Sequence, residues 1–126
     1  MKTLFRALLA FAIGSIALEA KVQVESDFPG GSVVVDKLDE KARFLRFRPM
    51  NYKNKGWACW WSFKVSGLKP GEIWKLSLQG SGFAVPKRAS ISSDGKTWKH
   101  SAPGKRSGKF HVYEIEVPTE TTWFAW

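Results

Sequence analysis

Large and small side chains alternate along residues 57–65, and this is the clearest pattern in the chain. One face carries Trp57, Cys59, Trp61, Phe63 and Val65. The other face carries Ala58, Trp60, Ser62 and Lys64. A period of two over these nine residues predicts a β-strand with one buried face. The polar segment 66–71 (SGLKPG) that follows is typical of a turn, because Pro70 presets the backbone angle φ.

Comparable segments recur at a spacing of roughly ten residues, which is typical of all-β domains. Strands are predicted over residues 32–36, 42–48, 57–65, 73–79, 88–92, 97–101, 109–117 and 121–126. Turns rich in glycine, proline or aspartate separate them. We therefore predict one antiparallel β-sandwich of about eight strands over residues 21–126. Its predicted inner faces also carry Leu45, Phe47, Trp74, Leu76, Leu78, Tyr113, Ile115 and Val117.

Residues 1–20 have the pattern of a secretory signal peptide. Lys2 and Arg6 precede an apolar stretch of about ten residues, and Ser15-Ile16-Ala17 or Leu18-Glu19-Ala20 offers a cleavage site. An N-terminal helix of the domain is the alternative. The first interpretation predicts an exported protein, periplasmic or secreted, with no membrane span after cleavage. The one cysteine, Cys59, excludes an intramolecular disulfide and is expected to be a small buried apolar residue.

The chain is basic, with a formal net charge of +9. Such a charge favours anionic partners in general. The basic residues are scattered through predicted loops, and neither an arginine-rich helix nor zinc-finger spacing is present. Specific nucleic-acid binding is therefore not expected.

One motif could suggest a metal site. Residues 111–114 (HVYE) match the H-x-x-E pattern of some zinc sites. On a strand, however, His111 and Glu114 point to opposite faces and cannot reach one ion together. His100 is the only other histidine, and no G-x-S-x-G motif is present. We predict no catalytic, cofactor-binding or metal-binding residue in this chain.

Residues 92–98 (SSDGKTW) resemble the Asp-box hairpins of secreted β-proteins. Asp94-Gly95 favours a type I′ turn, with Trp98 folded onto the strand pair. Trp60 differs from its neighbours because it is a large aromatic residue on the polar face of its predicted strand. An exposed tryptophan can stack on a sugar ring or contact a neighbouring domain; a covering loop is the third possibility.

Three stretches together suggest a family: residues 27–33 (DFPGGSV), 60–71 and 123–126 (WFAW). Their order and spacing resemble the N-terminal β-sandwich domain of zinc metallocarboxypeptidases of the cytosolic-carboxypeptidase subfamily. The resemblance covers residues 28–126. It implies that zinc, its H-x-x-E pair and later histidine, the carboxylate-binding arginine and the glutamate base belong to a catalytic domain. That domain would begin after Trp126, so none of these groups is placed in this chain.

The resemblance predicts a non-catalytic exported domain, either truncated or stand-alone. Its partner would be a carboxypeptidase catalytic domain, whose substrate access it would help to shape. The candidate interaction surface comprises Trp60, Trp123, Phe124 and Trp126. The alternative is a carbohydrate-binding module that uses the same exposed aromatic residues.

Overall fold

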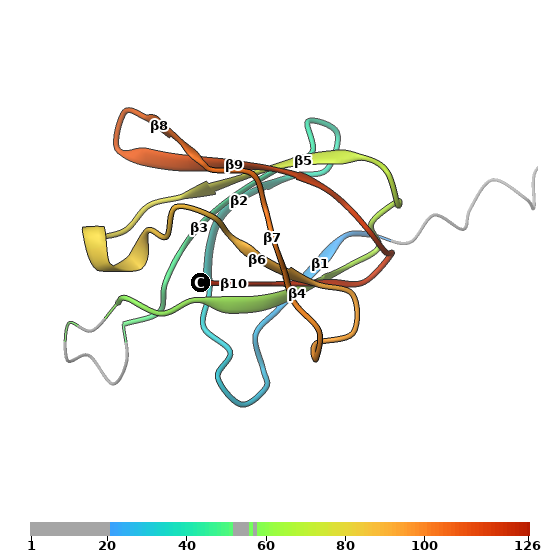
Figure 1. Cartoon of the computed structure of the whole chain (residues 1–126), viewed down its shortest axis with the longest axis horizontal. Coiled ribbons are helices and arrows are strands. Elements are labelled where there is room, and N and C mark those ends of the chain that lie inside the picture. The colour runs from blue at the N-terminus through green and yellow to red at the C-terminus, as the bar shows by residue number, and fades with distance from the viewer. Residues whose placement is uncertain (1–20, 52–55, 57) are drawn as a thin grey trace, which may run out of the picture.

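The computed structural model describes residues 21–51, 56 and 58–126, which form two five-stranded sheets (Figure 1). The first sheet has the strand order β1 (Gln23–Glu25), β4 (Ser62–Ser66), β10 (Thr122–Ala125), β6 (Ser90–Ser92) and β7 (Lys99–His100). The second has the order β2 (Val34–Asp39), β3 (Phe44–Arg48), β5 (Ile73–Leu78), β9 (Phe110–Glu116) and β8 (Lys105–Ser107). The predicted all-β sandwich is confirmed.

The second sheet is mixed, whereas the sequence predicted antiparallel pairing throughout. Strands β3 and β5 run parallel, with Leu45 opposite Leu76. The reason is the path of the chain between them, because β4 crosses to the first sheet and pairs there with β1 and β10. The chain therefore re-enters the second sheet in the direction in which it left. Strands β1 and β8 were not predicted.

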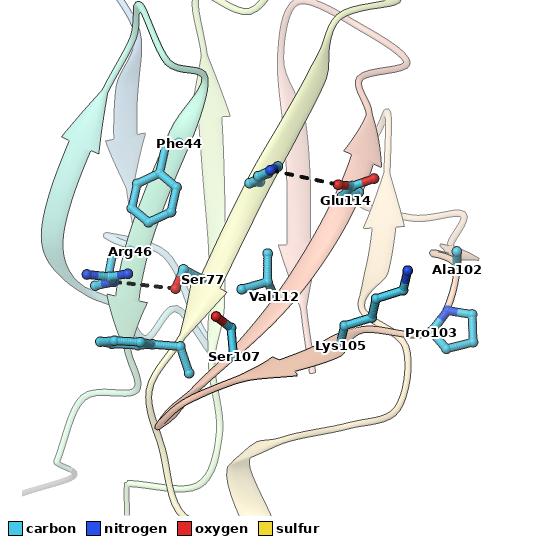
Figure 2. A pocket seen from close by; sticks show the side chains of 11 residues that line it. Phe44, Arg46, Ser77, Ala102, Pro103, Lys105, Ser107, Val112 and Glu114 are labelled. Carbon is cyan, nitrogen blue, oxygen red and sulfur yellow. Dashed lines mark hydrogen bonds and ion pairs between the residues drawn. The ribbon is translucent and has the colours of Figure 1, made fainter.

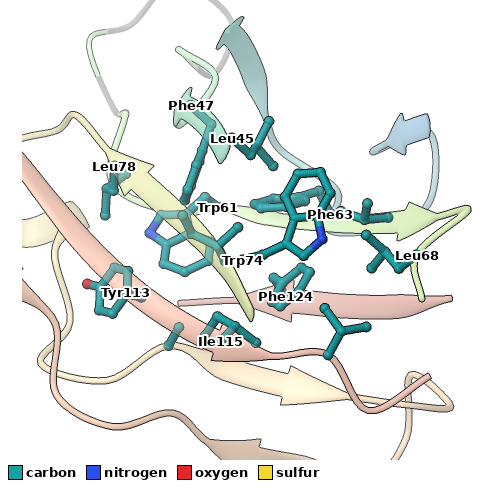
Figure 3. Packing of buried hydrophobic residues seen from close by; sticks show 14 residues of the cluster. Leu45, Phe47, Trp61, Phe63, Leu68, Trp74, Leu78, Tyr113, Ile115 and Phe124 are labelled. Carbon is teal, nitrogen blue, oxygen red and sulfur yellow. The ribbon is translucent and has the colours of Figure 1, made fainter. Parts of the chain in front are cut away.

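The inner faces of both sheets enclose one aromatic core (Figure 3). The predicted inward residues of β3, β5 and β9 are all buried, as are Trp61, Phe63 and Val65. The Phe47 ring lies edge-on to Trp61 and Phe63, with centroid distances of 5.0 and 4.9 Å. The alternation in the sequence therefore identified the core side of these strands correctly.

The strand predicted over residues 57–65 begins only at Ser62. Trp57 lies outside the described residues. Cys59 is exposed, so its predicted burial is wrong. The reason is that the preceding segment leaves the sheet: the Trp60 indole N–H donates to the carbonyl of Gly30 at 2.7 Å. The alternation of large and small side chains predicts burial only where the backbone is a strand paired in a sheet.

Residues 92–98 form a hairpin connection between β6 and β7, but without the predicted type I′ turn. That turn needs two residues with positive φ, and only Gly95 has one, at +76°. The Asp94 carboxylate organises the loop instead, accepting bonds of 2.8 Å each from the backbone N–H groups of Lys96 and Thr97 and the Thr97 hydroxyl. These bonds hold the pKa of Asp94 well below its usual range.

The described part of the chain contains no helix that is long and apolar enough to cross a membrane.

Candidate interaction surface

Among the described residues, three exposed aromatic side chains meet at one end of the sandwich. Trp60 precedes β4, Phe83 lies in the short 3₁₀ helix η2 (Gly82–Ala84), and Trp126 follows β10. Their exposed fractions are 48%, 85% and 47%. In Figure 1, η2 and the C-terminus lie towards the same side of the molecule. The three residues line a shallow pocket of about 480 Å³ together with Gly56, Ala58, Cys59 and Ser81. We refer to this set of residues as the aromatic surface.

Hydrogen bonds fix the two tryptophans from their polar edges. The Trp126 indole N–H donates to the Phe83 carbonyl at 3.0 Å, which ties the chain end to η2. The Trp126 backbone N–H donates to the Trp61 carbonyl at 3.0 Å, extending the β10–β4 pairing by one residue. On the other side, the Ser32 hydroxyl donates to the Trp60 carbonyl at 2.8 Å. Both indole N–H groups are thus used internally, which leaves apolar ring surface facing outwards.

The lining of the aromatic surface is poor in polar groups. Among the described residues that line it, none is charged, and Ser81 and Cys59 carry the only hydroxyl and thiol. A depletion of charge around large rings is typical of the centre of a protein–protein interface. Chemically, the surface can bury an apolar partner but offers few groups for hydrogen bonding.

The structure brings only half of the predicted surface together. Trp60 and Trp126 both line it. Phe124, in contrast, is 1% exposed and lies in the core, with 5.6 Å between its ring centroid and that of Phe63. Its assignment to the surface is therefore wrong. Neighbouring residues of a strand point to opposite faces, so the aromatic run 123–126 cannot form one patch.

Trp123 lies on the outer face of the first sheet, away from the pocket lined by Trp60 and Trp126. It is half-buried beneath the 92–98 loop, where a Cβ at Gly95 would come within 3.3 Å of the ring. The Lys64 ammonium lies 5.8 Å from the ring centroid. These contacts make Trp123 a packing residue of this loop.

Phe83 was missed by the sequence analysis, although it is the most exposed large apolar residue of the described part. It directly follows Gly80-Ser81-Gly82, a run that predicts a turn, so no strand pattern assigns this residue to a face. A phenylalanine directly after such a run was the available signal.

The residues present do not fit a zinc site. His111 packs against the Tyr113 ring, with 5.1 Å between centroids, and its Nε2 is buried without a hydrogen-bond partner among the described residues. Burial and the nearby Arg106 lower the pKa of His111. Glu114 lies on the outer face of the same strand, beside Lys75. Within the described residues, no group of three or more potential ligands could hold a metal ion.

Bacterial carboxypeptidases are among the solved structures that match this chain. No protein-family model and no curated protein matches it. A metallo-carboxypeptidase from Burkholderia cenocepacia aligns over 83% of this chain with 17% identity and a TM-score of 0.71. One from Pseudomonas aeruginosa, solved with (2-guanidinoethylmercapto)succinic acid, aligns over 82% with 22% identity and a TM-score of 0.72. A putative carboxypeptidase from Burkholderia mallei aligns over 83% of this chain with 19% identity and a TM-score of 0.71.

These matches establish a shared fold. The chain spans only 28–29% of the length of these structures. A β-sandwich that occurs within bacterial metallo-carboxypeptidases is therefore also the fold of this chain. The finer assignment, to the cytosolic-carboxypeptidase subfamily, stays a prediction.

Proposed function

We propose that this chain is a non-catalytic, exported accessory domain of the metallocarboxypeptidase type. It docks through the aromatic surface onto a zinc-peptidase catalytic domain and helps to shape substrate access there. Zinc, the catalytic base and the carboxylate-binding arginine would all be supplied by that partner. The observation that carries the proposal is the aromatic surface, three exposed rings on a fold found within much longer peptidases.

The size of the aromatic surface suits the centre of an interface. A whole aromatic side chain contributes about 150–250 Å², so the exposed parts of the three rings amount to roughly 350 Å². A standard interface buries about 800 Å² on each partner, with a few aromatic residues near its centre providing most of the binding energy. The three rings would supply somewhat under half of such a footprint, and the surrounding surface would supply the rest.

Carbohydrate binding is the second candidate for the same rings. Sugar recognition needs hydrogen-bonding side chains around the stacking ring, because the hydroxyl groups of the sugar lose water on binding. The described lining offers one hydroxyl and one thiol, and both indole N–H groups are already bonded within the protein. This chemistry favours an apolar protein partner.

Self-association of the isolated chain provides a test, because an uncovered apolar interface promotes association. We expect sedimentation velocity at tens of micromolar to show dimers or larger species. The Phe83→Ser variant should shift the chain towards the monomer, since this ring has the largest exposed fraction. Trp98→Ser is the matched control, because Trp98 is 41% exposed but does not line the aromatic surface.

The opposite outcome is equally specific. A monodisperse monomer that binds an insoluble neutral glycan such as cellulose, with binding abolished by Trp60→Ala, would establish the carbohydrate-binding alternative. Equal self-association of the wild type and Phe83→Ser would show that the chain does not associate through the aromatic surface.

A further inference from the structure

A second pocket lies on the outer face of the β2-β3-β5-β9-β8 sheet. It shares no described lining residue with the aromatic surface. Its volume is about 490 Å³, and Figure 2 shows the side chains that line it. Strands β3, β5, β8 and β9 contribute the outward side chains that line it, and Ala102 and Pro103 complete it. Figure 2 shows Phe44 and Arg46 on one side, with Lys105 and Pro103 across from them. We call this pocket the Arg46 groove.

Arg46 is held in place by two aromatic rings. Its guanidinium carbon lies 3.7 Å from the Phe110 ring centroid and 5.0 Å from the Phe44 ring centroid. Its Nε donates to the Ser77 hydroxyl at 3.4 Å, across the β3–β5 pairing. Stacking on aromatic faces restricts the guanidinium without using its outer N–H groups. The side chain is therefore preorganised, which lowers the entropy lost when a ligand binds.

The terminal NH₂ groups of Arg46 make no hydrogen bond to the described residues. Lys105 and Lys75 add positive charge to the lining, and among the described lining residues only Glu114 is negatively charged. The Lys75 ammonium lies 4.0 Å from the Glu114 carboxylate, which partly neutralises both groups. Positive charge thus remains around Arg46, and a planar guanidinium fork matches a carboxylate in bidentate geometry.

The remainder of the lining fits a sugar ring that carries this carboxylate. The Ser107 hydroxyl and Glu114 can accept hydrogen bonds from sugar hydroxyls, and Pro103 and Val112 offer apolar surface to a ring face. An acidic peptide can donate its backbone N–H groups to these acceptors and carries the same negative charge as a uronate, but it has no sugar ring face to lie against Pro103 and Val112. We propose that the Arg46 groove binds uronate-bearing oligosaccharides, with a carboxylate on Arg46. This site is independent of docking through the aromatic surface.

The test is calorimetric titration of the purified chain with tetragalacturonate at 0.15 M salt. Cellotetraose, a neutral tetrasaccharide, and a tetraglutamate peptide serve as matched ligands. We expect binding of the uronate alone. Arg46→Lys keeps the charge but loses the bidentate fork, and it should weaken binding at least about tenfold. Amide chemical-shift changes in NMR spectra should be confined to the groove, including Ser107 and Val112.

Lys69→Gln removes one exposed charge outside the groove and controls for non-specific attraction. It should leave the affinity unchanged within about twofold at this ionic strength. Lys105→Gln changes an exposed groove residue and provides a second test if Arg46→Lys fails to fold. If Lys69→Gln weakened uronate binding as much as the groove variants do, the binding would be non-specific attraction to the positive charge of the whole chain, and the proposal would be overturned. Absence of uronate binding, or equally tight binding of tetraglutamate, would overturn it too.

Discussion

Replacing Trp61 by alanine should produce one of the largest losses of stability in this domain. The side chain is fully buried and contacts the rings of Phe47, Phe63 and Tyr113. Truncating a buried large aromatic residue typically costs about 3–5 kcal/mol. The indole N–H also donates to the buried Ala84 carbonyl at 2.8 Å, and an unsatisfied buried acceptor costs about 1–3 kcal/mol more. We therefore expect a loss of about 5 kcal/mol.

Trp60→Ala is the matched control, one residue away. It also loses an indole hydrogen bond, but the acceptor, Gly30, is exposed and water can replace the donor. We expect a loss of about 1 kcal/mol. The free energy of unfolding of a domain of this size is about 5–15 kcal/mol, so Trp61→Ala could unfold it. Trp61→Phe is a less damaging variant, expected to cost about 2 kcal/mol because the hydrogen bond of the indole is lost.

Urea denaturation followed by far-ultraviolet circular dichroism measures these differences. The Phe83→Ser background removes the expected contribution of self-association. The three variants should rank with Trp61→Ala as the most damaging and Trp60→Ala as the least. A loss for Trp60→Ala that equals or exceeds that for Trp61→Ala would refute the packing argument.

Three further predictions concern single side chains or their ligands. Cys59 should react with iodoacetamide in the native protein at the rate of an exposed thiol, and a bulky maleimide there should reduce self-association; labelling that requires denaturant would contradict its position. Because the pKa of Asp94 is lowered in the folded protein, its carboxylate stabilises the fold above about pH 4, and this contribution fades as the pH falls further. The difference in thermal midpoint between the wild type and Asp94→Asn should therefore shrink below pH 4, and a constant difference would contradict this prediction. The dialysed chain should contain no stoichiometric zinc by metal analysis, because His111 and Glu114 face apart; one zinc per chain, lost in His111→Ala, would show otherwise.

The buried faces of the long strands could be predicted from the sequence because alternation directly reports burial. Leu45 and Phe47 on β3, and Tyr113 and Ile115 on β9, each follow the period of two and line the core. The all-β sandwich follows from this alternation together with the spacing of the turns.

The two missed strands leave little signal in the sequence, because both are short and only β1 contributes an apolar side chain, Val24, to the edge of the core. The β8 residues Lys105–Ser107 are all exposed at the edge of their sheet, and β1 (Gln23–Glu25) is a short edge strand of alternating exposure. Short, charged edge strands discourage pairing with other chains, and the same composition hides them in the sequence. The parallel β3–β5 pair was equally hidden, since it depends on the sheet that β4 joins.

The candidate surface was predicted in part, for reasons that differ from residue to residue. Trp60 was found because it broke the pattern of its segment. Phe124 was misplaced because the terminal aromatic run was treated as one patch, although strand geometry separates neighbours. Phe83 joins the surface only through the fold, which brings η2 beside the end of β10.

The most direct test of the proposed docking function is titration of this chain with a zinc-peptidase catalytic domain encoded in frame with it or beside its gene. The account predicts a one-to-one complex with micromolar or tighter affinity. Phe83→Ser should weaken that complex at least about tenfold, and Trp98→Ser should leave it unchanged. Absence of a complex, or one that Phe83→Ser binds as tightly as the wild type, would contradict the account.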